Sequence, residues 1–309
     1  MGTLWTVRLA ELPDGVKLEQ VQHGIEQRLL EINQLMSTYI SDSAISRFNQ
    51  APAGTRFEVP EEFSQVLRSA LVMASESGGM FDPTVGPLVN LWGFGPAARS
   101  GTPPSAADLE QARARIGYRK LEASVDADLI VQPGGLYLDL SAIAKGYAVD
   151  ALGAYLDQLG IHNWLVDIGG DLRARGSKPG GVPWRIAIER PLAGRREIDS
   201  VLEIHDLAVA TSGDYRNFFE ADGQRFSHTI DPRTGRPVSH QLASVSVLHQ
   251  ECMEADGLAT LLTVMGAEEG MAFAEARNLA VLFIVHEGDG FKELMTSAFR
   301  HHLMQGRDQ

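Results

Sequence analysis

The stretch NWLVDIGGDLRARGSKPGGVPWRIAIERPLAGRREIDSVLEIHDLAVAT, residues 163–211, decides the fold class. Its β-branched and aromatic residues gather in short runs separated by turn residues such as Gly169 and Gly170, a pattern typical of β-strands. We expect strands here at 163–168, 184–189, 200–204 and 207–211. Outward from this stretch, the same signals predict strands at 4–10, 225–230, 242–248 and 281–285, and short strand-like runs between residues 120 and 140.

Helices are predicted mainly before this stretch and again near residues 253–277. Residues 18–36 place Val21, Ile25 and Leu29 at helical spacing. Similar spacing predicts a helix at 61–76, and Ser105 as an N-cap predicts one to about Ile116. Further helices are expected at 143–159, 253–264 and 267–277.

This order of elements differs from the regular strand–helix alternation of a doubly wound fold. The sequence therefore predicts an α+β protein with a mixed or antiparallel sheet and flanking helices. It contains no internal repeat and no linker between independent parts, so we expect one large domain over residues 1–309.

Composition excludes several classes of protein. The 309 residues carry 27 Lys and Arg against 40 Asp and Glu, a net charge of −13, so the chain lacks the broad positive field that nucleic-acid binding uses. No apolar run is long enough to span a membrane. Cys252 is the only cysteine, which excludes an intrachain disulfide. No leader is visible, so the protein is either cytoplasmic or exported with its leader removed.

The common catalytic motifs are missing. Gly93-Phe94-Gly95 begins like a dinucleotide fingerprint but lacks its third glycine, and there is no phosphate-binding P-loop, HExxH or GxSxG motif. The chemistry must therefore lie in less familiar segments.

Two of these segments place polar side chains on a constrained backbone. Residues 79–88, in a predicted loop over 78–104, set Asp82 between glycines and prolines, which fits either a ligand-binding loop or a capped structural loop. Residues 138–147 join a strand to a helix, and Lys145 lies in the first turn, where the helix dipole disfavours a cation. An anionic ligand would explain this lysine, although an exposed surface lysine is the commoner case.

Two more segments offer a base and metal ligands. His228 ends a strand before the Asp231-Pro232 turn, where a histidine can act as a general base, although a lone histidine is more often structural, and His301 and His302 look like tail residues. Asp256 and Thr260 lie four residues apart on one helix face. A carboxylate and a hydroxyl suit Mg²⁺, but a helix-start Asp and a Thr bonded to the backbone are an equal alternative.

Together and in this order, these segments resemble the ApbE family of FAD:protein FMN transferases. Each motif alone is weak, whereas the ordered set is specific and extends over nearly the whole chain. The matching stretches are MGT (1–3), MSTY (36–39), SAISRFN (43–49), FDPTVGP (81–87), DLSAIAKG (139–146), DIGGD (167–171), ATSGDY (210–215), HTIDPRTG (228–235) and ADGLAT (255–260).

The resemblance implies an enzyme that binds FAD and Mg²⁺ and moves FMN onto a Thr or Ser hydroxyl of a target flavoprotein, releasing AMP. The implied targets are subunits of Rnf-type and sodium-pumping NADH:quinone reductase complexes, or flavoproteins of nitrous-oxide respiration. Family members of this kind are usually exported, so the expected location is the periplasm, with a lipid anchor where a leader supplies one. The MGT motif at the start suggests a trimmed mature chain.

The resemblance also implies roles for particular residues. The FAD contacts correspond to Met1, Tyr39, Met80, Phe81, Asp82, Asp139, Lys145, His228, Thr229 and Ile230. The magnesium ligands correspond to the main-chain carbonyl of Ala142 and the side chains of Asp256 and Thr260. His228 corresponds to the catalytic base; Asp167, Gly170 and Thr211 lie in further motifs near the ligand.

Two other functions fit the same residues. A Mg²⁺-dependent pyrophosphatase would use water in place of the acceptor hydroxyl and give FMN and AMP. A non-catalytic FAD carrier or assembly factor would need no base, so the presence of His228 with Asp256 and Thr260 argues against it.

Overall fold

A computed structural model describes residues 2–96, 102–122, 125–126, 128–191, 198–213, 218–221, 224–288 and 290–305. The chain forms two compact units, and each is described by itself. Unit 1 contains Met1–Leu30, Lys145–Arg216 and Gln241–Gln309, and unit 2 contains Glu31–Ala144 and Asn217–His240. Both units are therefore built from segments that are distant in the sequence.

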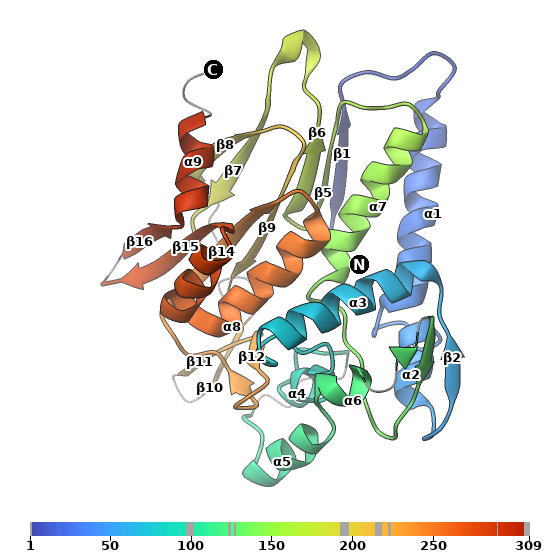
Figure 1. Cartoon of the computed structure of the whole chain (residues 1–309), viewed down its shortest axis with the longest axis vertical. Helices are drawn as coiled ribbons and strands as arrows, with labels where there is room; N and C mark the ends of the chain where they lie inside the picture. Colours follow the sequence, from blue (N-terminus) through green and yellow to red (C-terminus); the bar gives the residue numbers. More distant parts are fainter. Residues whose placement is uncertain are drawn as a thin grey trace. The chain divides into compact units, whose positions relative to one another are not determined.

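The centre of unit 1 is a seven-stranded sheet (Figure 1). Its strands, in their hydrogen-bonded order, are β1 (Trp5–Leu9), β5 (Trp164–Ile168), β6 (Asp171–Arg175), β9 (Leu207–Gly213), β14 (Leu242–His249), β15 (Ala280–Glu287) and β16 (Gly290–Met295). All neighbouring strands are antiparallel. The α+β class is confirmed, and of the two predicted sheet types the antiparallel one is found.

The middle of this sheet is buried on both faces. On β15, Ala280, Leu282 and Ile284 belong to an apolar cluster with the hairpin of β7 (Trp184–Glu189) and β8 (Ile198–Ile204) and with α9 (Ser297–Gln305). The alternate residue Phe283 faces α8, where a Cβ built on Gly270 would lie 3.1 Å from its ring. Two-sided burial explains why the β15 sequence is a continuous apolar run rather than an alternating one.

The long helices agree with the predictions from spacing. They are α1 (Leu18–Met36), α3 (Glu61–Glu76), α7 (Ala144–Gln158) and α8 (Cys252–Ala276). Gly266 breaks the helical backbone within α8 with a φ of 78°, which accounts for the two helices predicted at 253–264 and 267–277. No helix in the described ranges combines the length and apolar character needed to cross a membrane.

Unit 2 consists of short elements around loops. Its helices are α3, α2 (Ala44–Gln50), α4 (Gly86–Leu91), α5 (Ala106–Ala114) and α6 (Tyr118–Glu122). A small sheet joins β2 (Arg56–Glu58), β4 (Leu129–Val131) and β3 (Val125–Asp126), and two hairpins pair β10 (Phe218–Ala221) with β11 (Gln224–Ser227) and β12 (Ile230–Asp231) with β13 (Arg236–Pro237).

Some local predictions were wrong. Helix α4 lies within the predicted loop 78–104, because Pro87 at the start of a helix supplies a suitable φ and needs no N–H partner. Strand β6 was missed because its sequence DLRAR is mostly polar, and β16 was missed as well. His301 and His302, predicted as tail residues, belong to α9.

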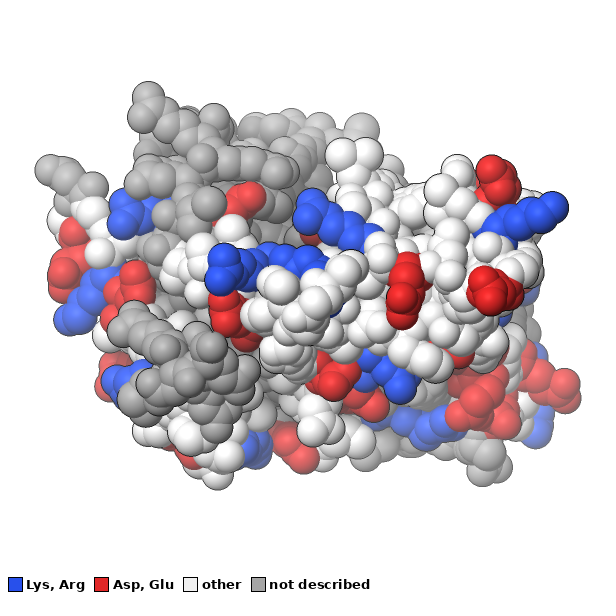
Figure 2. Space-filling model, turned by 90° about the horizontal axis from the view of Figure 1, so that it is seen from above, with Lys and Arg blue, Asp and Glu red and all other residues white. Residues whose placement is uncertain are grey.

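On the face drawn in Figure 2, basic and acidic residues are interspersed among uncharged ones.

Candidate functional site

Three charged side chains of unit 1 meet where α7 begins. The Lys145 ammonium lies 2.9 Å from Asp256 Oδ1 and is also hydrogen-bonded to Asp171 Oδ2. The two carboxylate side chains are only 3–4 % exposed, whereas that of Lys145 is 35 % exposed. We call Lys145, Asp171 and Asp256 the charged cluster. Two carboxylates of the protein itself therefore account for the cation in the first turn of α7.

A close approach of two helix starts builds this cluster. A Cβ on Gly146 would lie 2.2 Å from the carbonyl oxygen of Cys252, so only glycine permits the approach of α7 to α8. Asp150 on α7 then caps α8, because its carboxylate accepts the backbone N–H groups of Cys252 (3.1 Å) and Met253 (2.8 Å). The next turn of α8 carries Asp256.

Burial and charge shift the protonation of the cluster. Burial raises the pKa of Asp256 to about 7, Lys145 partly offsets this, and the neighbouring Asp171 adds to it. For Lys145, desolvation lowers the pKa, but the two carboxylates outweigh it and the net pKa is raised. Two buried carboxyl groups therefore share a single ammonium group, an arrangement that favours a second cation.

Hydroxyl-bearing residues lie near these carboxylates on α8 and β9. Thr260, one turn after Asp256, places its Oγ1 3.4 Å from Ser212 Oγ on β9. The neighbouring Thr211 donates its N–H to Asp171 Oδ1 (3.2 Å) and pairs its hydroxyl with Ser246 (2.8 Å). Carboxylate and hydroxyl oxygens are hard ligands of the kind Mg²⁺ prefers. No group of three or more His, Cys, Asp or Glu side chains that could hold a metal ion occurs among the described residues.

His228 lies in unit 2, in the connection between β11 and β12. Its ring meets the Phe94 ring edge-on at 6.3 Å between centroids. The Phe94 carbonyl accepts the Tyr39 hydroxyl (3.2 Å), and Tyr39 is 67 % exposed. The structure thus brings two predicted site residues, Tyr39 and His228, to the same aromatic residue.

The turn after His228 is held from several sides. Gly235 N–H bonds the Asp231 carbonyl (2.8 Å), and the Gly235 carbonyl accepts Trp92 Nε1 (2.8 Å). Arg113 on α5 donates to the Arg233 carbonyl (2.8 Å). Trp92 also stacks on Phe226 of β11, at 5.5 Å. These contacts fix the strand end that carries His228, as the Asp-Pro turn predicted.

The neighbouring predicted contacts follow His228 directly. The Thr229 N–H donates to Ser227 Oγ at 3.2 Å, and its carbonyl accepts the Val238 N–H at 3.0 Å. The Ile230 side chain is buried in an apolar cluster with Leu88 and Trp92. The Ile230 side chain therefore serves the fold, and the backbone N–H and carbonyl of Thr229 are bonded within the protein.

The 79–88 segment forms a loop fixed by its own carboxylate. Asp82 is 8 % exposed; its Oδ1 accepts the N–H (2.8 Å) and hydroxyl (2.6 Å) of Thr84, and its Oδ2 accepts the Tyr118 N–H (3.1 Å). Burial raises the pKa of Asp82, and these hydrogen bonds partly offset it. Phe81 is buried as well, whereas Met80 is partly exposed. Asp82 therefore has a structural role here.

Asp139 and Ala142 lie just before α7 in the turn that leads to it. Asp139 Oδ1 accepts the Ser141 N–H at 2.9 Å, and its own N–H bonds the Pro83 carbonyl at 2.8 Å. Ala142 is partly exposed. Residues 79–88 and 138–144, parts of two segments that the sequence suggested separately, are thus adjacent within unit 2.

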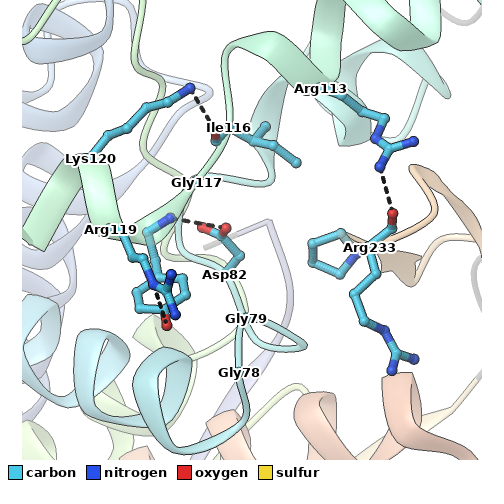
Figure 3. Close-up of a pocket in the computed structure, with 11 residues that line it drawn as sticks. Gly78, Gly79, Asp82, Arg113, Ile116, Gly117, Arg119, Lys120 and Arg233 are labelled. Atoms are coloured by element: carbon cyan, nitrogen blue, oxygen red, sulfur yellow. Dashed lines mark hydrogen bonds between the residues drawn. The ribbon is translucent and has the colours of Figure 1, made fainter.

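A pocket of about 450 Å³ opens beside Asp82 in unit 2 (Figure 3). Four of its lining side chains are basic: Arg113, Arg119, Lys120 and Arg233. Lys120 donates to the carbonyls of Ala114 and Ile116 at the end of α5 (2.8 and 3.0 Å), so part of this positive charge stabilises a helix end.

The predicted residues are thus distributed over both units. Unit 1 carries Lys145, Asp256 and Thr260; unit 2 carries Tyr39, Met80, Phe81, Asp82, Asp139, Ala142, His228, Thr229 and Ile230. Met1 lies outside the described residues.

Two residues of these sites were missed from the sequence. Asp171 stood in the DIGGD motif without a role, and no sequence signal paired it with Lys145, which lies 26 residues earlier. Phe94, the neighbour of His228, gave no such signal, because an aromatic residue in a predicted loop is ordinary.

Comparisons with known proteins all point to one family. Residues 1–283 match the ApbE family. A Vibrio cholerae protein named FAD:protein FMN transferase is 46 % identical over 304 residues, 98 % of this chain and 90 % of that protein. An Escherichia coli K12 protein of the same name is 37 % identical over 311 residues, 100 % of this chain and 88 % of that protein.

Solved structures are similar over the same range. The flavin transferase ApbE from Vibrio cholerae superposes with a TM-score of 0.89 at 45 % identity, covering 97 % of this chain and 96 % of that one. The apo form of the Pseudomonas stutzeri flavinyl transferase ApbE also gives 0.89, at 43 % identity, with 97 % and 93 % covered.

Proposed function

This chain belongs to the ApbE family, and we propose that it is a Mg²⁺-dependent FAD:protein FMN transferase. It moves FMN from FAD onto a threonine or serine hydroxyl of an acceptor protein and releases AMP. The observation that carries the metal dependence is the charged cluster, in which two buried carboxylates share one ammonium group, with Thr260 one turn along α8 from Asp256.

The residues present fit a magnesium ion. Asp256 and Thr260 supply side-chain oxygens from one face of α8, and the resemblance assigns the main-chain carbonyl of Ala142 as a third ligand. A magnesium ion held by these oxygens would supply positive charge to offset the pyrophosphate of FAD and the charge on the departing AMP. A protein of net charge −13 needs such local compensation to bind a pyrophosphate.

The protein's own residues supply the other parts of the reaction. Lys145 binds a phosphate oxygen, and His228 removes the proton from the acceptor hydroxyl. A bond forms between the acceptor oxygen and the phosphorus nearer the flavin, while the bond from that phosphorus to the bridging oxygen breaks. AMP leaves with the bridging oxygen, and the proton remains on His228 until solvent accepts it. Tyr39, Met80 and Asp139 contribute to the FAD site.

The proposed acceptors are flavoprotein subunits with a reactive Thr or Ser, of the Rnf or sodium-pumping NADH:quinone reductase type or serving nitrous-oxide respiration. The proposed location is the periplasm, where the protein is either free or held by a lipid anchor. Both follow from the resemblance of the ordered motifs.

The decisive experiment combines the purified chain with FAD, Mg²⁺ and a domain bearing a candidate acceptor threonine. We expect a fluorescent acceptor band on a denaturing gel and an added FMN mass, both abolished by EDTA. Free FMN and AMP without labelled acceptor would identify the pyrophosphatase. Tight FAD binding without either product, against several acceptor domains, would identify the carrier and refute the transferase.

A further inference from the structure

We propose that Asp171 is a positioning residue for metal binding: it retains the Lys145 ammonium when Asp256 exchanges this ammonium for a divalent cation. The inference rests on the proposed function, because it concerns the same metal. It adds a residue that neither the motif assignments nor the names of the relatives provide.

The two oxygens of Asp256 have different partners. Oδ2 accepts the backbone N–H of Gly146 at 3.0 Å, at a helix start whose geometry the glycine fixes. Oδ1 accepts the side-chain ammonium of Lys145 at 2.9 Å. A backbone donor in a packed helix cannot leave, whereas a lysine side chain can rotate. A cation that binds Asp256 side-on therefore competes with Lys145 for Oδ1.

Asp171 gives the displaced ammonium a second partner. Its Oδ1 accepts the Thr211 N–H from the neighbouring strand β9, which fixes the carboxylate on the sheet, and its Oδ2 accepts Lys145. Lys145 is bonded to both carboxylates at once, so it can leave Asp256 and remain paired. An isolated ammonium beside a buried metal ion would be strongly unfavourable.

This arrangement predicts opposite changes in metal affinity for substitutions of Asp171 and of Lys145. Without the Asp171 charge, Lys145 has Asp256 as its remaining carboxylate and competes harder with the metal. Asp171→Asn should therefore weaken metal binding by roughly 10–100-fold, the usual effect of an outer-shell partner. Lys145→Met removes the competitor and should tighten metal binding. In the Lys145→Met background, Asp171→Asn should change the affinity by less than about threefold, because the two residues act as a coupled pair.

The experiment measures Mn²⁺ affinity of the purified full chain without FAD, by the free-ion signal in electron paramagnetic resonance. It compares wild type, Asp171→Asn, Lys145→Met and the double variant, with circular dichroism to confirm folding. Asp157→Asn is the matched control, since Asp157 also carries a salt bridge to a basic residue of the same unit, Arg175. If Asp171→Asn does not fold, Lys145→Met remains a test, because competition for Asp256 Oδ1 requires tighter binding in that variant.

Two results would overturn the proposal: unchanged affinity in Asp171→Asn, or an equal loss in both backgrounds, which would make Asp171 act independently of Lys145. Weaker binding in Lys145→Met would also contradict it. Asp256→Asn separates this failure from failure of the proposed metal site. If Mn²⁺ binds that variant as it binds wild type, the metal site itself is wrong, whatever Asp171 does.

Discussion

Asp256 of unit 1 and Asp82 of unit 2 are both buried carboxylates, 2 % and 8 % exposed, but their oxygens are used differently. Asp82 accepts three hydrogen bonds from Thr84 and Tyr118, two of them from backbone N–H groups. Asp256 accepts one backbone N–H and one lysine side chain. A carboxylate engaged by fixed donors stabilises a loop, whereas one shared with a movable cation can exchange that cation for a metal. Burial alone does not distinguish the two.

The largest effect is expected at His228, the residue of unit 2 with a proposed role in the reaction itself. His228→Ala should reduce FMN transfer by about 10²–10⁴-fold, because it removes the general base, while the affinity for FAD changes little. Single-turnover transfer and FAD titration measure the two quantities. His162→Ala, at an exposed histidine beside Asp157, is the control. Full transfer activity in His228→Ala would refute the assigned role.

The comparison of the two carboxylates is tested directly by matched amide substitutions. Asp256→Asn should lower Mg²⁺-dependent activity by at least ~100-fold, since even outer-shell partners of metals cost 10–100-fold. Asp82→Asn should keep its Mg²⁺ response and lose about 1–3 kcal/mol of stability, because the Tyr118 N–H loses its acceptor. Mg²⁺ titration and urea unfolding separate these effects. Loss of FAD binding by Asp82→Asn at unchanged stability would instead make Asp82 a ligand contact.

The helix approach that presents Asp256 gives a third test. Gly146→Ala would place a methyl group against the Cys252 carbonyl, so α7 and α8 must separate, which costs about 1–3 kcal/mol by overpacking. Metal binding should weaken with it, since the Gly146 N–H also holds Asp256. Thermal unfolding and Mn²⁺ binding are the measurements. Gly290→Ala, whose Cβ would come no closer than 3.8 Å to Glu287, is the control. Equal behaviour of the two variants would contradict this account.

Sequence reasoning succeeded where a local pattern determines the structure. Apolar spacing was sufficient for α1 and α3, and the polar N-cap Ser105 marked the start of α5. It failed where tertiary packing decides: β6 is a mostly polar strand that joins the sheet because β5 and β9 flank it.

The same limit applies to the site. His228, Asp256 and Lys145 could be identified from ordered motifs, but the pairing of Lys145 with Asp171 depends on residues 26 positions apart that the fold brings together. The different uses of Asp82 and Asp256 also depend on their donors, which no spacing in the sequence specifies. The division of the chain into two units of interleaved segments was not predicted for the same reason.

A smaller effect concerns pH. Burial raises the pKa of Asp82 above 3.8, so the folded protein holds this proton more tightly than the unfolded chain does. The stability that protonated Asp82 contributes to the fold is therefore complete below pH 3.8, and it is lost as pH rises through the pKa of Asp82 in the folded protein. Wild type should gain stability over Asp82→Asn as pH falls from about 7 to about 4. Urea midpoints measure this, with Asp42→Asn as an exposed control; the opposite trend would show that hydrogen bonding outweighs burial.

The smallest effect tests whether the basic pocket positions His228 or only lies beside it. Arg113→Ala removes one of the bonds that hold the turn after His228, while the Trp92 bond to Gly235 remains. We expect a loss of about 1 kcal/mol in stability and less than a tenfold (~1.4 kcal/mol) fall in the transfer rate. Arg115→Ala is the matched control, because Arg115 ends the same helix but donates to Gly135. A rate loss specific to Arg113→Ala would assign the pocket rim to positioning the base. An increase in the FAD concentration needed for half-maximal rate would instead assign the pocket to substrate binding, and it would weaken the contrast between the two units.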